Sequence, residues 1–385
     1  MRKTVYATLA LGLLALNLRA ADKPRARDLG VPFDGTPGPL NAITDVKGVE
    51  VGESTIIRGE GKLVVGKGPV RTGVTAVLPR GERSNDDPVF AGWFSQNGNG
   101  EMTGTTWVEE SGFLEGPVMI TNTHSVGTVR DAVIAWRVRH GGADQSGYWW
   151  SLPVVAETWD GELNDVNGFH VKAENVDEAL GSAREGAVAE GNVGGGTGMV
   201  CYGFKGGIGT ASRRLAEAAG GYTVGALVQC NCGRKADLLI AGVPVGREIA
   251  GKGTRDEDSG SIIIVVATDA PLLPHQLKRL ARRATMGLAR TGSSSGNGSG
   301  DIFIAFSTAN PGAAATKGTV TPTMLPNDRM NPLFSATVQA VEEAIVNAMV
   351  GAETMTGANG VTVRALPHDE LQKALKKYNR LAEKP

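Results

Sequence analysis

The chain contains little cysteine and no surplus of basic charge. Three cysteines among 385 residues are too few for a disulfide scaffold, and a bridge between Cys230 and Cys232, one residue apart in an apolar segment, would close a strained loop. We therefore expect buried free thiols. The 39 Lys and Arg residues are balanced by 40 Asp and Glu, and no basic run or stacking motif is present. Nucleic acid is therefore not an expected partner.

Motifs of several enzyme classes are also missing. The five histidines form no HExxH motif or other paired ligand spacing, so nothing in the sequence indicates a metal site or a cofactor. The glycine-rich stretch 191–209, GNVGGGTGMVCYGFKGGIG, has GxGxxG-like spacing but lacks the GKS or GKT ending of a phosphate-binding loop. We interpret it as tight turns and close backbone packing. No GxSxG motif surrounds Ser261, which disfavours a serine hydrolase of the nucleophile-elbow type.

The one long apolar run lies at the N-terminus. Residues 1–20 begin with Arg2 and Lys3, continue through an apolar middle and end in small residues, which is the layout of a cleaved secretory signal. An N-terminal membrane anchor is the alternative. No later stretch approaches the roughly 20 apolar residues of a spanning helix. We therefore expect an exported protein, periplasmic or secreted, with no membrane association once the signal is removed.

Strand-like and helix-like patterns fill the rest of the chain. An irregular arm is predicted for residues 22–45, and we find no domain boundary beyond the signal. Even the low-complexity stretch 291–300, TGSSSGNGSG, is interpreted as a loop inside one domain. Apolar runs predict strands at 74–78, 118–121, 154–156, 224–229 and 301–306, and helical periodicity predicts helices around 126–136 and over 176–184, 274–290 and 335–350.

The stretch 257–273, EDSGSIIIVVATDAPLL, places Gly260 and Ser261 at the mouth of an apolar strand. A serine hydroxyl here can attack the preceding carbonyl, and hydrolysis of the resulting ester would free a new chain end at Ser261. That end would carry both a hydroxyl and an α-amine whose ordinary pKa of about 8 suits a base. Gly260 lowers the steric resistance to this attack. On its own, however, a Gly-Ser pair before a strand is more often structural.

Longer motifs give Ser261 a specific interpretation. The run 260–292, GSIIIVVATDAPLLPHQLKRLARRATMGLARTG, is followed by GSGDIFIAFSTAN. Together they resemble the β-subunit start of the peptidase family that contains the D-stereospecific L-aminopeptidases and the β-peptidyl aminopeptidases. The segments 151–165, SLPVVAETWDGELND, and 191–213 resemble the same family. The resemblance covers most of the chain, from about residue 32 to the last predicted helix.

This resemblance implies that the precursor cuts itself between Gly260 and Ser261 and that Ser261 is the nucleophile. It also implies two supporting residues in the GSGDIF motif. Ser299 would hydrogen-bond the hydroxyl or amine of Ser261, and Asp301 would orient Ser299. Some family members carry Glu at the last of these positions, and Asp is its shorter equivalent.

The family resemblance implies further residues around the nucleophile. Asn231, in LVQCNCG, matches the Asn that stabilises the oxyanion, and Tyr148, in SGYWWSLP, matches a Tyr that positions the substrate. An aminopeptidase must also bind a free ammonium, which requires a carboxylate near the nucleophile. Asp131 and Glu157 are the two candidates, and a structural ion pair or a surface charge is the alternative for each.

The implied fold is a four-layer α/β/β/α sandwich of the N-terminal-nucleophile-hydrolase kind. Residues 21–260 and 261–385 would be the α- and β-subunits of a single catalytic domain, and the family's habit suggests a tetramer of such heterodimers. The expected reaction removes an N-terminal residue, a β-amino acid or an L-amino acid, from small peptides, amides and esters through an acyl-enzyme. Amides and esters of D-Ala are further possible substrates.

Two alternatives to an aminopeptidase stay open at this point. An acyltransferase of the ornithine-acetyltransferase kind has a related architecture, but those enzymes usually expose Thr after cleavage, and a secretory signal does not fit a biosynthetic role. A non-catalytic exported binding protein of the same fold is the other alternative. It predicts a chain that remains uncut.

Overall fold

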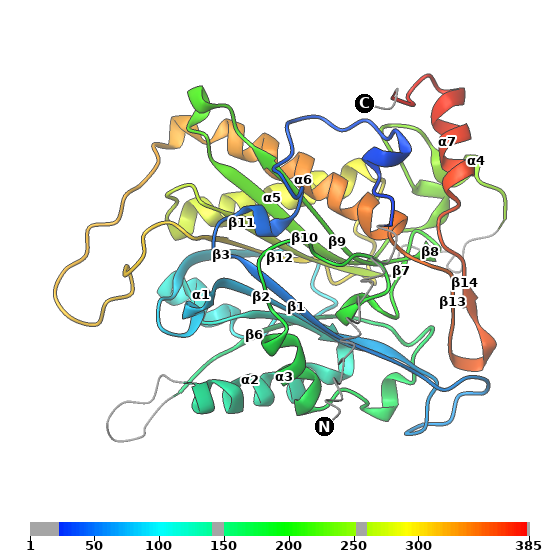
Figure 1. Ribbon diagram of the computed structural model, residues 1–385, viewed down its shortest axis with the longest axis horizontal. Helices are drawn as coiled ribbons and strands as arrows, with labels where there is room; N and C mark the ends of the chain where they lie inside the picture. The colour runs from blue at the N-terminus through cyan, green and yellow to red at the C-terminus, as the bar shows by residue number, and fades with distance from the viewer. Residues whose placement is uncertain (1–22, 141–149, 252–259, 383–385) are drawn as a thin grey trace, which may run out of the picture.

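The computed structural model describes residues 23–140, 150–251 and 260–382. In these ranges the strands form two main β-sheets that pack face to face, and helices cover the outer side of each (Figure 1). One buried apolar cluster lies between the two sheets. A second lies between the larger sheet and its helices, and a third lies between the smaller sheet and its helices. This order of layers confirms the predicted α/β/β/α sandwich.

The larger sheet contains the strand that begins at Ser261. Its strand order is β4 (Phe113–Leu114), β3 (Val89–Ser95), β12 (Ile302–Ser307), β11 (Ser261–Thr268), β10 (Thr223–Asn231) and β9 (Gly207–Arg214). β11 pairs antiparallel with β10 and parallel with β12. A parallel pair needs a crossover connection, and the helix α5 (Pro274–Arg290) supplies it.

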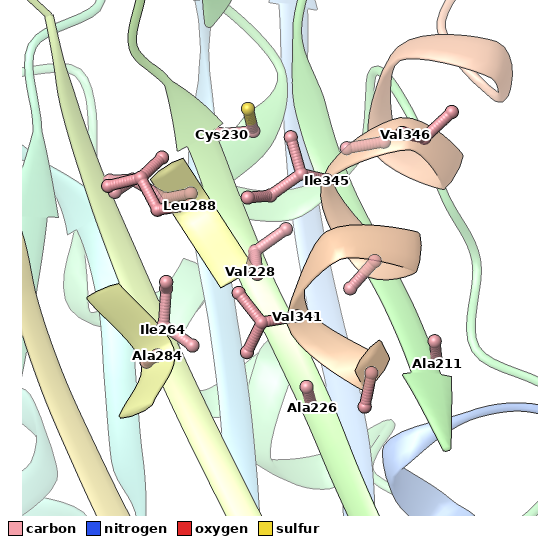
Figure 2. Close-up of a cluster of buried hydrophobic side chains, with 14 of the residues drawn as sticks. Ala211, Ala226, Val228, Cys230, Ile264, Ala284, Leu288, Val341, Ile345 and Val346 are labelled. Carbon is pink, nitrogen blue, oxygen red and sulfur yellow. The ribbon is translucent and has the colours of Figure 1, made fainter. Parts of the chain in front are cut away.

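Helices α5 and α6 (Asn331–Val350) cover the outer face of this larger sheet (Figure 1). α5 has the predicted bounds, with Pro274 in its first turn, whereas α6 begins before the predicted Ser335. Figure 2 shows Val341 and Ile345 of α6 beside Val228 of the sheet, in one buried cluster. The helix faces predicted from apolar periodicity are therefore the faces that pack on the strands.

Every residue of β11 is buried, because both faces of the larger sheet are covered. Side chains alternate along a strand, so Ile262 and Ile264 pack toward the helices, whereas Ile263 and Val265 pack toward the smaller sheet. By the same alternation Ser261 faces the space between the two sheets.

The smaller sheet has the order β1 (Glu50–Arg58), β2 (Val70–Glu82), β5 (Val118–Asn122) and β6 (Val154–Thr158). Helices α2 (Val126–His140) and α3 (Ala173–Gly181) cover its outer face. α3 begins and ends three residues before the predicted range 176–184, and Arg184 does not continue the helix. Its backbone instead pairs with Val51, with N···O distances of 3.1 and 3.2 Å, in an isolated bridge to β1.

Short elements complete the described part of the chain. Two small hairpins are β7 (Val200–Cys201) with β8 (Phe204–Lys205), and β13 (Met355–Thr356) with β14 (Thr362–Val363); the short helices are α1 (Thr105–Ser111), α4 (Val245–Glu248) and α7 (His368–Lys377). The predicted irregular arm contains only 3₁₀ turns between residues 23 and 45. Among the helices described, none has the length and apolar character needed to cross a membrane.

Candidate active site

Ser261 lies at one end of the space between the sheets. It is the first residue of β11 and stands directly opposite Asn231, the last residue of β10. Its exposed fraction is 7%, and its Oγ accepts a hydrogen bond from the backbone N–H of Gly300 at 3.0 Å. The hydroxyl is therefore held in a fixed position while a small part of the residue still reaches solvent.

The turn that precedes β12 contacts this serine. Because β11 and β12 run parallel with Ile263 opposite Ile302, the turn before β12 lies beside the start of β11. Gly300 supplies the N–H to Ser261, and Oδ1 of Asp301 accepts the backbone N–H of Ile262 at 3.2 Å. Asp301 is fully buried. The GSGDIF motif therefore contacts both the nucleophile candidate and the peptide group after it.

Ser299 lies in the same turn but does not make the expected contact. Its side chain is fully buried, and its Oγ forms no hydrogen bond with any residue that the structure describes. The backbone of Gly300 contacts Ser261 in place of the Ser299 hydroxyl. The prediction that Ser299 adjoins the site is consistent with this position, whereas the hydrogen bonds predicted from Ser299 to Ser261 and from Asp301 to Ser299 are not formed.

The side chain of Asn231 is held at both ends of its amide. Its Oδ1 accepts the backbone N–H of Val200 at 2.8 Å, and its Nδ2 donates to the carbonyl of Trp159 at 2.9 Å. A backbone N–H can only donate and a carbonyl can only accept, so these two partners fix which end of the amide carries the nitrogen. Asn231 is 1% exposed. Its amide is therefore held in one orientation on the strand next to Ser261.

Glu157 lies near this group, at the end of β6 in the smaller sheet. Its Oε1 accepts the backbone N–H of Glu101 at 3.0 Å, and its Oε2 accepts the hydroxyl of Thr123. Burial raises the pKa of the Glu157 carboxyl, although both hydrogen bonds oppose the rise. Gly100 packs between this carboxylate and the turn: a Cβ added to it would lie 3.3 Å from Glu157 Oε1 and 2.9 Å from the Cα of Gly300.

Two other predicted site residues are not placed with this group. Asp131 lies on the solvent side of α2, where its side chain is 81% exposed and its carboxylate is 3.5 Å from Arg130. α2 covers the outer face of the smaller sheet, so that sheet separates Asp131 from Ser261. The prediction that Asp131 lies near the nucleophile is therefore not supported, and Glu157 is the candidate that the fold brings there. Tyr148 lies outside the described residues.

Two of the three cysteines differ from the prediction of buried thiols outside any disulfide. Cys230 is not a free thiol but forms a disulfide with Cys201, because the β7–β8 hairpin folds against the end of β10. Cys232 is buried and is not part of this bridge, although its Sγ is 3.9 Å from that of Cys230. The three sulfur atoms are the only group in the described ranges with the spacing of a metal site, but two of them are bonded to each other.

Several contacts at this site come from backbone atoms and were not predicted. The N–H groups of Gly300 and Val200 and the carbonyl of Trp159 hold the side chains of Ser261 and Asn231. Every residue type except proline carries such groups, so the sequence contains no signal for them. Gly300 and Val200 do lie inside the two glycine-rich motifs, where close backbone approach is expected.

The sequence and the fold both match known proteins. A profile described as peptidase family S58 matches residues 41–363. The chain is 56% identical to the β-peptidyl aminopeptidase BapA of Sphingosinicella microcystinivorans, with 98% of each chain covered, and 50% identical to BapA of Sphingosinicella xenopeptidilytica, with 92% and 91% covered.

A solved structure gives the same result for the fold. The L-aminopeptidase D-Ala-esterase/amidase of Ochrobactrum anthropi, described as a prototype serine aminopeptidase with a variant of the Ntn-hydrolase fold, superposes with a TM-score of 0.86. The two sequences are 50% identical, and the match covers 94% of this chain and all of the other. None of these three relatives is named as an acyltransferase. The chain therefore belongs to peptidase family S58 and is an aminopeptidase.

Proposed function

We propose that this aminopeptidase becomes active by cutting its own chain between Gly260 and Ser261. The observation that carries the proposal is the position of Ser261: its hydroxyl is held by Gly300 at the first residue of a buried strand, opposite a preoriented amide. The Oγ attacks the carbonyl carbon of Gly260, the C–N bond breaks, and the nitrogen of Ser261 takes up a proton. Water then hydrolyses the ester and releases Gly260 as a carboxylate.

The new N-terminus of Ser261 then supplies both nucleophile and base. Its Oγ attacks the carbonyl carbon of the substrate's N-terminal residue, and its α-amine accepts the hydroxyl proton. The amine passes this proton to the leaving nitrogen as the C–N bond breaks, which leaves an ester on Ser261. Water, deprotonated by the same amine, hydrolyses the ester. No cofactor is needed at any of these steps.

Asn231 has the geometry to stabilise the negative charge that forms in both reactions. Donors that already point at the developing oxyanion need no reorganisation in the transition state, and a buried site strengthens their effect. The Asn231 amide is fixed in orientation between Val200 and Trp159 and is almost fully buried, which supports this assignment. We assign Ser299 and Asp301 to the support of the nucleophile and Tyr148 to substrate positioning.

Glu157 is the carboxylate that we assign to the substrate ammonium. It lies on the opposite sheet from Ser261, separated from the Gly300 turn by the backbone of Gly100. A buried carboxylate with a raised pKa is stabilised in its charged form when a cation binds beside it. An ammonium bound here would place the adjacent acyl carbon toward Ser261, as an aminopeptidase requires.

We propose β-amino acids as the preferred N-terminal residues of the substrate, in small peptides and amides. The support is the 56% identity to a β-peptidyl aminopeptidase along nearly the whole chain. L-amino-acid amides and D-Ala amides and esters are the competing substrate classes, suggested by the name of the Ochrobactrum relative. A direct comparison of β-homo-amino-acid amides with L-amino-acid and D-Ala amides separates the three.

The two fragments would remain together after the cut. β11 and β12 belong to residues 261–385, whereas β3, β9 and β10 of the same sheet belong to residues 21–260. Separation would break the β10–β11 and β3–β12 ladders and expose the apolar layers. We further propose export directed by residues 1–20 and assembly into a tetramer of heterodimers. Cell fractionation and the native mass of the purified enzyme test these two points.

Intact mass and N-terminal sequencing test the self-cleavage directly. The wild type should yield two fragments, one beginning at Ser261 with SIIIVV. Ser261→Ala should yield one uncut, inactive chain, whereas Ser294→Ala, at an exposed serine in the loop before β12, should cleave normally. A wild type that remains one inactive chain after prolonged incubation would refute the proposal.

A further inference from the structure

Lys205 is a buried cation in the glycine-rich stretch that the proposed mechanism does not use. It is the last residue of β8 and is fully buried. Its ammonium donates to the backbone carbonyls of Met199 and Gly206, both at 2.9 Å, and lies 3.4 Å from that of Gly196. Burial lowers the pKa of Lys205 to about 7, although the negative charge of Asp160 opposes the shift. Lysine is almost never fully buried without such partners.

One planar peptide group connects this ammonium to Asn231. The carbonyl of Met199 and the N–H of Val200 belong to the same peptide unit, which is rigid and has its two polar groups pointing in opposite directions. Lys205 binds the carbonyl end at 2.9 Å, and the N–H end donates to Oδ1 of Asn231 at 2.8 Å. A rotation of this peptide would break both hydrogen bonds. The positive charge also polarises the peptide and strengthens its N–H as a donor.

The remaining contacts of the hairpin hold it against β10. A Cβ added to Gly206 would lie 2.3 Å from the carbonyl oxygen of Cys230, so the hairpin packs too closely for any side chain there. Tyr202 donates its backbone N–H to the carbonyl of Cys232 at 2.7 Å. The hairpin is therefore attached on both sides of Asn231, and Lys205 fixes the peptide that donates to Oδ1 of Asn231.

We propose that Lys205 is the positioning residue of the oxyanion donor: through the Met199–Val200 peptide it sets the orientation of the Asn231 amide opposite Ser261. This inference rests on the proposed role of Asn231 in oxyanion stabilisation. It also gives the glycine-rich stretch 191–209 a function, which is to bring a charged side chain and a peptide N–H to the back of the active site.

Lys205→Met tests the inference because it removes the ammonium and keeps the length of the side chain. Lys235→Met is the matched control, since Lys235 is also buried and also donates to two backbone carbonyls, those of Gly246 and Ile249. Both variants should lose stability. Only Lys205→Met should lose turnover. Its kcat per cleaved chain should fall roughly 10- to 100-fold, since removing an oxyanion donor outright costs at least about 100-fold, and KM should change little.

A double-mutant cycle with Asn231→Ala separates this inference from the proposed function. If Lys205 acts through Asn231, then Lys205→Met should change kcat less than about twofold in the Asn231→Ala background. Full turnover by Asn231→Ala alone would refute the role of Asn231. An impaired Asn231→Ala together with normal kcat for Lys205→Met, or with losses that multiply, would refute the role of Lys205 alone.

A measurement on the wild type covers the case in which Lys205→Met does not fold. The amide hydrogen of Val200 should exchange with solvent as slowly as the amides of β10, because the peptide is held at both ends. Lys205→Arg, which keeps the charge but changes the donor geometry, should cleave itself and show a reduced kcat. Rapid exchange at Val200 in the wild-type enzyme would overturn the inference whatever the variants do.

Discussion

Asn231 and Ser261 are directly opposite each other in the antiparallel pair of β10 and β11. Asn231 is the last residue of β10, and Ser261 is the first residue of β11. Side chains at opposed positions share a face of the sheet, with Cβ atoms about 5 Å apart. The register of two buried strands therefore brings the amide to the nucleophile candidate. Asn231 and Ser261 thus take their places from the rigid core of the molecule.

Asn231→Asp tests the amide with little change in shape. A carboxylate can still accept the N–H of Val200, but it cannot donate to an oxyanion, and its charge would repel one. We expect kcat to fall by a factor of about 100 to 1,000 and self-cleavage to slow as well, measured by product release and intact mass. Asn192→Asp, a partly exposed amide in the glycine-rich stretch, is the control and should remain close to wild type.

Glu157→Gln should weaken substrate binding while it stabilises the fold. The amide can still accept the Glu101 N–H through its oxygen and donate to the Thr123 hydroxyl, so the local hydrogen bonds survive. The neutral side chain no longer attracts an ammonium, and KM for amino-acid amides should rise at least tenfold. Glu101→Gln, which removes a neighbouring exposed carboxylate, should change KM much less.

The stability gain of Glu157→Gln should depend on pH. Because burial raises the pKa of Glu157 above its ordinary value of 4.5, the folded chain binds more protons than the unfolded chain between the two pKa values. The free energy of unfolding of the wild type therefore falls as pH rises through this window and stays lower above it. Thermal unfolding should show a higher Tm for Glu157→Gln at pH 8 and no difference at pH 4 or below. An equal difference at both pH values would contradict this account.

The Cys201–Cys230 bridge should contribute to stability and to the attachment of the β7–β8 hairpin. The bridge spans 29 residues of sequence, and closing a loop of that length corresponds to about 3–4 kcal/mol in the chain-entropy account. Cys201→Ala should lower the urea midpoint of unfolding and reduce turnover, because the hairpin carries the Val200 N–H. Cys232→Ala keeps the bridge and should still lose stability when a reductant is added. If reduction leaves the wild type unchanged, the bridge is not a stabilising element.

The sequence predicted the helices and strands whose pattern of apolar residues lies within the segment itself. Apolar periodicity defined α5 from Pro274 to Arg290, and the long motif around Ser261 predicted a strand start that the structure has. Arg184 shows the limit of periodicity, because it pairs with a distant strand and does not continue α3. The Cys201–Cys230 bridge likewise depends on a hairpin folding back across the sheet, which spacing in the sequence does not reveal.

Glu157 and Asp131 show which part of the site could not be predicted from residue type alone. Both are carboxylates, yet Glu157 lies near the end of β6 beside the Gly100 and Gly300 backbone, whereas Asp131 lies exposed on an outer helix. The periodicity of α2 did contain a signal, since Val129 and Val133 define its buried face and Asp131 falls off it. Distance from Ser261, however, depends on how the two sheets stack, and that is a property of the whole fold.

Gly100→Ala tests whether the turn at Gly300 sets the position of the nucleophile. The added methyl group would lie 2.9 Å from the Cα of Gly300 and 3.3 Å from Glu157 Oε1, so the turn or the carboxylate must move. Gly300 holds the Ser261 hydroxyl, and displacements near 1 Å in such sites cost up to about 100-fold in rate. We expect self-cleavage and kcat to fall at least tenfold.

Gly98→Ala is the matched control for this substitution, because a Cβ at Gly98 has no atom within 4 Å. The two variants change the same residue type two positions apart in one loop, so any general effect of replacing glycine is common to both. Intact mass after fixed incubation times gives the cleavage rate, and product release per cleaved chain gives kcat. Wild-type rates for Gly100→Ala would mean that the turn can shift without moving the serine. The contact with Gly300 would then not determine the position of Ser261.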